Sequence, residues 1–280
     1  MKITVLVENS VCSRDISNVK AEHGLSLHIE LNEKKILFDT GQSNLFIQNS
    51  IKLGIDLSDV DYLIVSHGHV DHGGGLKHFL DINKKAKIFL HKTAVNKFYT
   101  KLFGFIPIYV GLDKSVIDKN QDRIQFVEKD FMISDNISII QNFPEIFPRS
   151  EINKTLYERK NNIYQKDSFI HEIGLVLKDK SELSVFTACS HSGLPNMIGE
   201  VKRRFNNANI KAVFGGFHIN NPISKKNASK EYINKLIEEI DLNDSTFYTG
   251  HCTGKSNFAY MKSKLGEKIH AMNSGNVINY

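Results

Sequence analysis

Six consecutive residues, His67-Gly68-His69-Val70-Asp71-His72, constrain this chain more than any other feature. The apolar run Tyr62–Val65 precedes them, and three glycines at 73–75 follow. This context predicts a strand that ends in a loop and then opens a helix. Imidazole and carboxylate groups are metal ligands, and so many polar groups at a strand end are costly to bury without an ion. The motif therefore predicts a metal site, in which two ions could divide the ligands.

Length and composition fit one large α/β domain. The chain has 280 residues, of which 41% are hydrophobic and 24% charged, so it can bury a core and is not globally disordered. Three cysteines give no disulfide framework, and no apolar stretch reaches the ~20 residues of a membrane span, so we expect a cytoplasmic protein without membrane contact. The net charge of +5 favours a small anionic partner, and no nucleic-acid-binding module is recognisable.

Alternating strand and helix signals predict layered sheets and helices. In the N-terminal part we expect strands at 3–7, 25–30, 35–38, 62–66 and 87–90, and helices at 44–53 and 74–81. In the C-terminal part we expect strands at 173–177, 183–187, 210–214 and 245–249, two short ones near 268–278, and helices at 195–206, 228–240 and 256–265. Residues 92–170 show no clear period, which favours loops or an insertion over the active site.

A second pattern repeats along the C-terminal half, where apolar strand candidates are followed by a histidine. His191, His218 and His251 each come shortly after such a run, as His67 does in the N-terminal half. Binding sites of α/β sheets gather at the carboxyl ends of strands. We therefore expect these four histidines to lie at one edge of the sheets and to contribute to one site.

The 67–72 motif is that of the metallo-β-lactamase superfamily, and the chain resembles one branch of it. That branch is named for 7,8-dihydropterin-6-methyl-4-(β-D-ribofuranosyl)aminobenzene 5′-phosphate synthase. The segments that carry the resemblance are Ala21-Glu22-His23-Gly24-Leu25-Ser26, Leu37-Phe38-Asp39-Thr40-Gly41, Pro148-Arg149, Cys189-Ser190-His191-Ser192-Gly193, Gly215-Gly216-Phe217-His218 and His251-Cys252-Thr253-Gly254. The resemblance implies a single domain over 1–280, folded as a four-layer αββα sandwich with metals at one edge of its two sheets.

Two departures from the superfamily pattern leave the ligand set open. The chain has neither the Gly-His-Thr nor the Gly-Asp-Thr segment of many members, and Ala188-Cys189-Ser190 stands in place of the second. Cys189 is then a soft ligand or a small residue beside the ligands, and His191 could replace the missing imidazole. His171 stands where the branch has Asp.

With this resemblance, the first metal is expected to take His67, His69 and His191, and the second Asp71, His72 and His251. Zn²⁺ is the expected ion, with Fe and Mn as alternatives, and a water or hydroxide between the ions would be the nucleophile. The further expected roles are catalysis by Asp71 and His218, orientation of a ligand by Asp39, and substrate binding by Arg149 and His23. His218 could instead be an extra ligand or bind a substrate phosphate.

These assignments predict a dinuclear metal-dependent hydrolase acting on a small anionic metabolite, with phosphorylated and pterin-related compounds as candidates. One alternative is a di-iron redox protein of the same fold, although the extra carboxylates and flavin domain of that class are not visible. The other is a metal-stabilised binding or sensor protein, which would hold metal without turnover.

Overall fold

The computed structural model describes residues 1–13, 18–223 and 226–279. The chain divides into two compact units. Unit 1 comprises Met1–Lys97, Val110–Glu128 and Met272–Tyr280, and unit 2 comprises Phe98–Tyr109 and Lys129–Ala271. Among the described residues, no helix combines the length and the apolar character that crossing a membrane requires.

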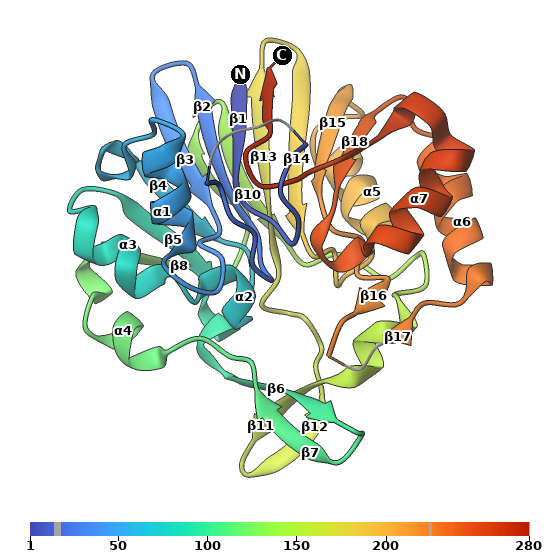
Figure 1. Ribbon diagram of the computed structural model, residues 1–280, viewed down its shortest axis with the longest axis horizontal. Coiled ribbons are helices and arrows are strands. Elements are labelled where there is room, and N and C mark those ends of the chain that lie inside the picture. Colours follow the sequence, from blue (N-terminus) through green and yellow to red (C-terminus); the bar gives the residue numbers. More distant parts are fainter. Residues whose placement is uncertain (14–17, 224–225, 280) are drawn as a thin grey trace. The chain divides into compact units, whose positions relative to one another are not determined.

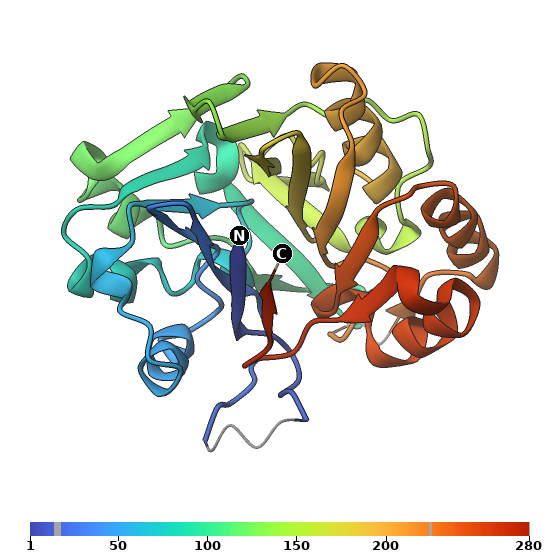
Figure 2. The same ribbon diagram turned by 90° about the horizontal axis from the view of Figure 1, so that it is seen from above.

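Unit 1 is built on a seven-stranded sheet in the order β20-β1-β2-β3-β4-β5-β8. Neighbours from β20 to β3 are antiparallel, and those from β3 to β8 are parallel. Figure 2 shows β20 beside β1, its partner at the sheet edge. The strands are β1 (Lys2–Val7), β2 (Ser26–Leu31), β3 (Lys34–Phe38), β4 (Tyr62–Val65), β5 (Lys87–His91), β8 (Ile124–Val127) and β20 (Val277–Asn279).

Helices of unit 1 cover one face of this sheet (Figure 1). Phe46, Phe79 and Ile117 come from three different helices and are buried with Leu63 and Ile88 of the strands. Burying each such side chain contributes about 1.5–3 kcal/mol relative to leaving it exposed. The helices are α1 (Leu45–Lys52), α2 (Val70–Gly73), α3 (Leu76–Ile82) and α4 (Lys114–Asp118), with 3₁₀ helices at Leu57–Asp59, Lys92–Val95 and Gln121–Arg123.

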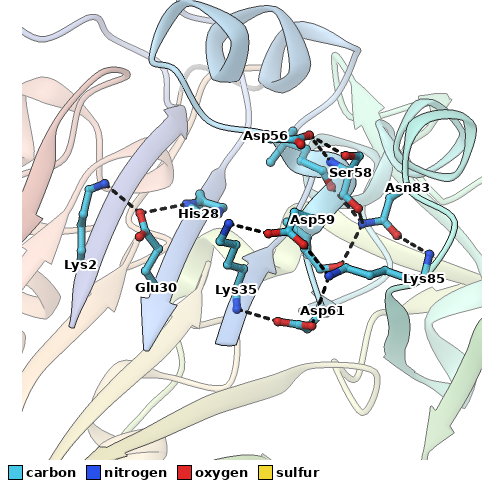
Figure 3. Close-up of polar contacts among 12 residues, drawn as sticks. Lys2, His28, Glu30, Lys35, Asp56, Ser58, Asp59, Asp61, Asn83 and Lys85 are labelled. Carbon is cyan, nitrogen blue, oxygen red and sulfur yellow. Dashed lines mark hydrogen bonds and ion pairs between the residues drawn. The ribbon is translucent and has the colours of Figure 1, made fainter. Parts of the chain in front are cut away.

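Polar contacts hold the loop that enters β4 (Figure 3). Asp59 accepts hydrogen bonds from the Nζ atoms of Lys35 and Lys85, each at 2.6 Å. The Asn83 amide donates to two carbonyls of the 57–60 turn at 2.9 Å. These contacts tie the start of β4 to β3 and to the loop after α3, so the strand leads to the His motif in a fixed register.

Unit 2 contains a second seven-stranded sheet, in the order β19-β18-β15-β14-β13-β10-β9. Neighbours from β9 to β14 are antiparallel, and those from β14 to β19 are parallel. The strands are β9 (Phe131–Ser134), β10 (Ile137–Gln141), β13 (Ile173–Asp179), β14 (Glu182–Ala188), β15 (Ile210–Gly215), β18 (Thr246–Thr249) and β19 (Ile269–Ala271).

Three helices of unit 2 pack on one side of this sheet, where Figure 1 shows them beside β15 and β18. Met197, Leu236 and Met261, one from each helix, are buried in a cluster with Val213 and Phe247 of the strands. The helices are α5 (Leu194–Arg204), α6 (Lys230–Asp241) and α7 (Lys255–Leu265), with 3₁₀ helices at Glu151–Thr155, His251–Thr253 and Gly266–Lys268.

Residues 92–170, where the sequence showed no period, contain short strands as well as loops. Four of these strands form a small sheet in the order β12-β11-β6-β7. Its apolar residues are divided: Phe98 of β6 and Leu156 of β11 are buried, whereas β7 is exposed throughout and Phe103 and Phe105 of the β6–β7 turn are more than two-thirds exposed. Its strands are β6 (Lys97–Leu102), β7 (Ile106–Tyr109), β11 (Leu156–Lys160) and β12 (Ile163–Lys166); a separate pair is β16 (Asn220–Asn221) with β17 (Lys226–Asn227).

Candidate metal centre

The His motif of unit 1 leaves β4 and turns at once into α2, as its sequence context predicts. The glycines that follow are required because their backbone passes close to the backbone of the segment after β3. A Cβ on Gly74 would lie 2.4 Å from the Gln42 carbonyl oxygen, and one on Gly75 would lie 2.5 Å from that of Thr40. Only glycine lets the loop pass this close to the segment after β3, and that segment carries Asp39.

Asp39 is a fully buried carboxylate at the centre of this loop region. Its Oδ1 accepts the main-chain N–H of Ser66 at 2.7 Å. Its Oδ2 accepts the Ser66 hydroxyl at 2.8 Å and faces His72 Nδ1 at 2.7 Å. The backbone of Asp39 is left-handed, with φ of +61°, a conformation that Asp tolerates better than most residues.

This network fixes the protonation of two motif histidines. Because Asp39 can only accept, His72 must donate its Nδ1–H. The Ser66 hydroxyl gives its proton to Asp39, so its oxygen accepts Nδ1–H of His67 at 2.8 Å. The Nε2 atoms of both rings then carry the lone pair, which is the form that binds a metal. The His67 ring lies 4.7 Å from that of His69 and 4.2 Å from that of His72, measured between centroids.

Asp71 projects from the same loop and is only 16% exposed at its side chain. His23 Nε2 lies 3.2 Å from Asp71 Oδ2, and Asn9 Nδ2 lies 3.3 Å from His23 Nδ1. Since an amide NH₂ only donates, His23 accepts at Nδ1 and donates Nε2–H to Asp71. Unit 1 thus brings together His23, Asp39 and all four motif ligands expected from the sequence. Oriented imidazoles and a carboxylate suit Zn²⁺, Fe²⁺ or Mn²⁺, so the residues present fit a divalent ion.

In unit 2, His191 is held on several sides. Its Nδ1 lies 3.1 Å from Asn153 Oδ1, and the Asn153 amide donates to the His191 carbonyl at 2.7 Å. Phe169 stacks on the imidazole with centroids 4.5 Å apart and ring planes at 8°. The His218 ring lies 4.1 Å away. His191 and His218 therefore meet, and Asn153 leaves the lone pair of His191 on Nε2.

A buried carboxylate positions the loop that carries His191. Glu172 accepts the main-chain N–H groups of His191 and Ser192, each at 2.7 Å. Burial raises the pKa of Glu172, and these hydrogen bonds oppose that rise. The neighbouring His171 is also buried, and its Nε2 contacts both carboxylate oxygens of Asp167 at 3.1 and 3.2 Å.

Cys189, His218 and Cys252 of unit 2 follow the ends of β14, β15 and β18 and are all buried. Burial raises the pKa of the Cys252 thiol, but contacts with Cys189 and His218 and the charges of His218 and His251 more than offset that rise, so its pKa is well below the ordinary value. His251 itself is buried and opens a 3₁₀ helix at the end of β18 with a left-handed φ of +49°.

Arg149 lines a pocket of about 250 Å³ within unit 2. Its Nη1 donates to the Ser168 carbonyl at 3.1 Å, and its Nε lies 3.3 Å from Glu145. The other lining residues are Glu145, Ser150, Glu151, Asn153, Lys154, Lys166, Asp167 and Phe169. Asn153 and Phe169 also contact His191, so the pocket adjoins that histidine.

No role was assigned from the sequence to four residues of these networks: Ser66, Asn153, Glu172 and Cys252. Ser66 directly precedes His67, so its position was a usable signal. Asn153 and Glu172 act on a loop 38 and 19 residues further along the chain, and no local pattern marks them. The assignment of one metal to His191 and the other to His251 stays a prediction.

Comparisons with known proteins show which families this chain is similar to. A family model described as the metallo-beta-lactamase superfamily matches residues 20–132. Two relatives come from Methanocaldococcus jannaschii. Uncharacterized protein MJ0448 is 29% identical over 90% of each chain. A 7,8-dihydropterin-6-methyl-4-(beta-D-ribofuranosyl)-aminobenzene-5'-phosphate synthase is 27% identical, over 93% of this chain and 90% of its own length.

Solved structures extend the likeness to the whole chain. Tm1679, described as a metal-dependent hydrolase of the beta-lactamase superfamily, has a TM-score of 0.83 and 29% identity, and the match covers 100% of this chain and 99% of Tm1679. Zn²⁺-bound PqqB from Methylobacterium extorquens has a TM-score of 0.62 and 12% identity over 100% of both chains, which shows a shared fold alone. The expected α/β fold of this type is confirmed, and the resemblance to the metallo-β-lactamase superfamily is found over the whole chain.

Proposed function

We propose that this chain is a metal-dependent hydrolase that holds two divalent metal ions, with Zn²⁺ as the first candidate, and acts on a small anionic metabolite. The proposed ligands are those assigned from the sequence: His67, His69, Asp71, His72, His191 and His251. The similarity to Tm1679, whose description is a metal-dependent hydrolase, supports the reaction class.

One observation carries the proposal: Asp39 and Ser66 fix two imidazoles in the metal-binding tautomer. The hydrogen bonds at 2.7 and 2.8 Å leave the Nε2 lone pairs of His72 and His67 for a ligand. A buried carboxylate with three hydrogen-bond donors aimed at it is a costly arrangement, and orienting metal ligands is its usual use. A structural loop would not need both rings held in the same tautomer.

Divalent ions bound here would supply Lewis acidity and lower the pKa of a bound water. Within unit 1, Asp71 would accept the proton that this water loses, and His23, 3.2 Å away, would hold the carboxylate in place. His218, beside His191 in unit 2, would donate a proton to the leaving group.

The substrate class follows from charge and from the relatives. The net charge of +5 favours an anion, and the Arg149 guanidinium can bind a phosphate or carboxylate with two hydrogen bonds. The relative named as a dihydropterin-ribofuranosylaminobenzene phosphate synthase makes phosphorylated and pterin-related compounds the first ones to test. The pocket beside Arg149 also contains Lys154 and Lys166, although the carboxylates of Glu145, Glu151 and Asp167 line it as well and balance these three cations.

The test measures metal content and hydrolysis together. Protein purified without chelator should contain close to two equivalents of Zn, Fe or Mn and hydrolyse members of a panel of phosphomonoesters, phosphodiesters and esters. His67→Ala should lose both properties, and His78→Ala, at a half-buried histidine of α3, should keep both. Less than half an equivalent of metal after reconstitution would refute the metal site. Full metal without turnover would favour a binding or sensor protein.

A further inference from the structure

Three parallel strands of unit 2 bring two cysteines and a histidine to one place. Cys189 follows β14, His218 follows β15, and Cys252 follows β18. One ligand atom from each, two Sγ and one imidazole nitrogen, lies within 4.8 Å of the other two. The three residues are 3%, 6% and 3% exposed, so the cluster is almost completely buried.

The histidine of this cluster is buried at a cost that nothing else in the described chain explains. Among the described residues, neither ring nitrogen of His218 has a hydrogen-bond partner. A buried imidazole normally satisfies at least one of its nitrogens. The backbone of His218 is also left-handed, with φ of +46°, which is unfavourable for a residue with a Cβ. Unsatisfied nitrogens and a strained backbone in one buried residue are typical of a ligand whose partner is an ion.

The sulfur of Cys252 is directed into the cluster by its surroundings. The main-chain N–H of His218 donates to Cys252 Sγ at 3.3 Å, the kind of hydrogen bond that stabilises a thiolate. A Cβ on Gly216 would lie only 2.4 Å from the same sulfur, so a glycine is needed to make room for it. The Gly215-Gly216-Phe217-His218 segment therefore supplies space, a donor and a ligand to one thiol.

We propose that Cys189, His218 and Cys252 form a Cys₂His site for a thiophilic metal ion, Zn²⁺ or Cu⁺. Two thiolates and one imidazole are a preferred donor set for these ions, whose bonds to sulfur and nitrogen of about 2.0–2.3 Å require ligand atoms close to one another. Three protein ligands leave a fourth position for water or a small molecule. This site goes beyond the proposed function, whose ligand set contains no cysteine. It replaces the proton-donor role given there to His218, because an imidazole bound to a metal no longer serves as a general acid.

Cobalt provides a direct probe, because Co²⁺ bound to thiolate shows an intense charge-transfer absorption in the near ultraviolet. Reduced full-length protein titrated with Co²⁺ should show this band, and His67→Ala, which removes a ligand of the proposed hydrolase site, should keep it. Cys252→Ser should weaken cobalt binding at this band by ~100-fold or more, since losing even an outer partner of a ligand costs ~10–100-fold. Cys12→Ser, at the buried cysteine of unit 1, is the matched control and should change nothing.

The outcomes separate this site from the hydrolase proposal. A band of the same intensity and affinity in Cys252→Ser, or no thiolate band in the wild type, overturns the Cys₂His site and leaves the two-metal proposal standing. Loss of turnover in His67→Ala with the band intact supports both. Should the Cys252 variant fail to fold, a wild-type measurement decides: an organomercurial should release one Zn²⁺ as it modifies Cys189 and Cys252. Modification of Cys189 and Cys252 without release of metal would refute the proposal.

Discussion

The two units share one strand pattern but place their candidate metal ligands on it differently. Each has a seven-stranded sheet whose first four strands pair antiparallel and whose later neighbours pair parallel, in the orders β20-β1-β2-β3-β4-β5-β8 and β9-β10-β13-β14-β15-β18-β19. Unit 1 concentrates four candidate ligands in the 67–72 loop after β4. Unit 2 places Cys189, His218 and His251 after three different strands. The candidate ligands of unit 1 are therefore neighbours in the sequence, whereas those of unit 2 are far apart in the sequence and come from different strand ends.

The difference extends to how the side chains are oriented. In unit 1, Asp39 and Ser66 hold two rings through direct side-chain contacts. In unit 2, the buried carboxylate of Glu172 accepts the main-chain N–H groups of His191 and Ser192 and contacts the Ser192 side chain, so it places a loop and leaves the His191 ring to Asn153. Unit 2 also places four non-glycine residues at or just beyond the carboxyl ends of β14, β15 and β18 in left-handed conformations: Ala188, Ser190, His218 and His251. A dispersed site thus depends on backbone strain that the surrounding structure must hold, at about 1–2 kcal/mol per residue.

The largest expected effect tests whether the unit 1 loop carries the chemistry. Asp71→Asn keeps the shape and removes the charge, so turnover on any substrate found in the panel should fall by ~10²-fold or more, the usual scale for a positioned acid–base group. Folding should survive, because Asp71 lies in the one-turn helix α2 and Asn has nearly the same size. Steady-state kinetics on metal-replete protein measure this, with Asp81→Asn, at an exposed residue of α3, as the control. Turnover close to wild type in Asp71→Asn would show that the motif is structural.

The corresponding test in unit 2 concerns His191. If this residue is a ligand, His191→Ala should lower metal affinity by at least the ~10–100-fold that losing an outer partner costs, while the fold persists. Competition with a chelating dye measures the affinity, and circular dichroism checks the fold. His270→Ala, at a half-buried histidine of β19 in the same unit, should leave affinity unchanged. Equal stoichiometry and affinity in His191→Ala would restrict the metal ligands of this chain to other residues.

The same contrast explains what the sequence could reveal. Strands and helices with a clean hydrophobic period, such as β4, β14 and α6, appear within a few residues of their expected bounds. The 67–72 motif was legible because its ligands are neighbours, and Asp39 stood out in a Leu-Phe-Asp-Thr-Gly segment. The roles of Asn153 and Glu172 could not be recognised from the sequence, because a hydrogen bond across 38 or 19 residues depends on the fold rather than on a local pattern. The small β6–β7–β11–β12 sheet was hidden because β7 and most of β12 are exposed, so these strands do not alternate between apolar and polar residues.

The two buried carboxylates offer a sharper comparison. Asp39→Asn puts an NH₂ or a weaker acceptor against His72 and Ser66, so the ring loses its orientation and metal affinity should fall ~10–100-fold. Glu172→Gln should mainly cost stability, about 1–3 kcal/mol, because one main-chain N–H of the 191–192 loop would face an amide NH₂. Chelator competition and urea unfolding measure the two quantities on both variants. A larger loss of metal affinity in Glu172→Gln than in Asp39→Asn would reverse the roles assigned here.

The smallest expected effect lies at the opposite end of β4 from the motif, where Asp59 bridges Lys35 and Lys85 (Figure 3). Hydrogen bonds from Lys35 and then Lys85 lower the pKa of Asp59 from 3.8 to about 2. Because the folded-state pKa is the lower one, the contribution to stability is present above pH 3.8 and is lost as the pH falls towards 2. Asp59 is exposed, so water and salt screen both ion pairs, and such pairs contribute little.

Asp59→Asn should therefore shift the thermal midpoint at pH 7 only slightly, and less in 1 M salt than in dilute buffer. Metal content and turnover should not change. A loss of metal in this variant would mean that the start of β4 sets the position of the motif at its end, and that the unit 1 site is less local than its sequence implies.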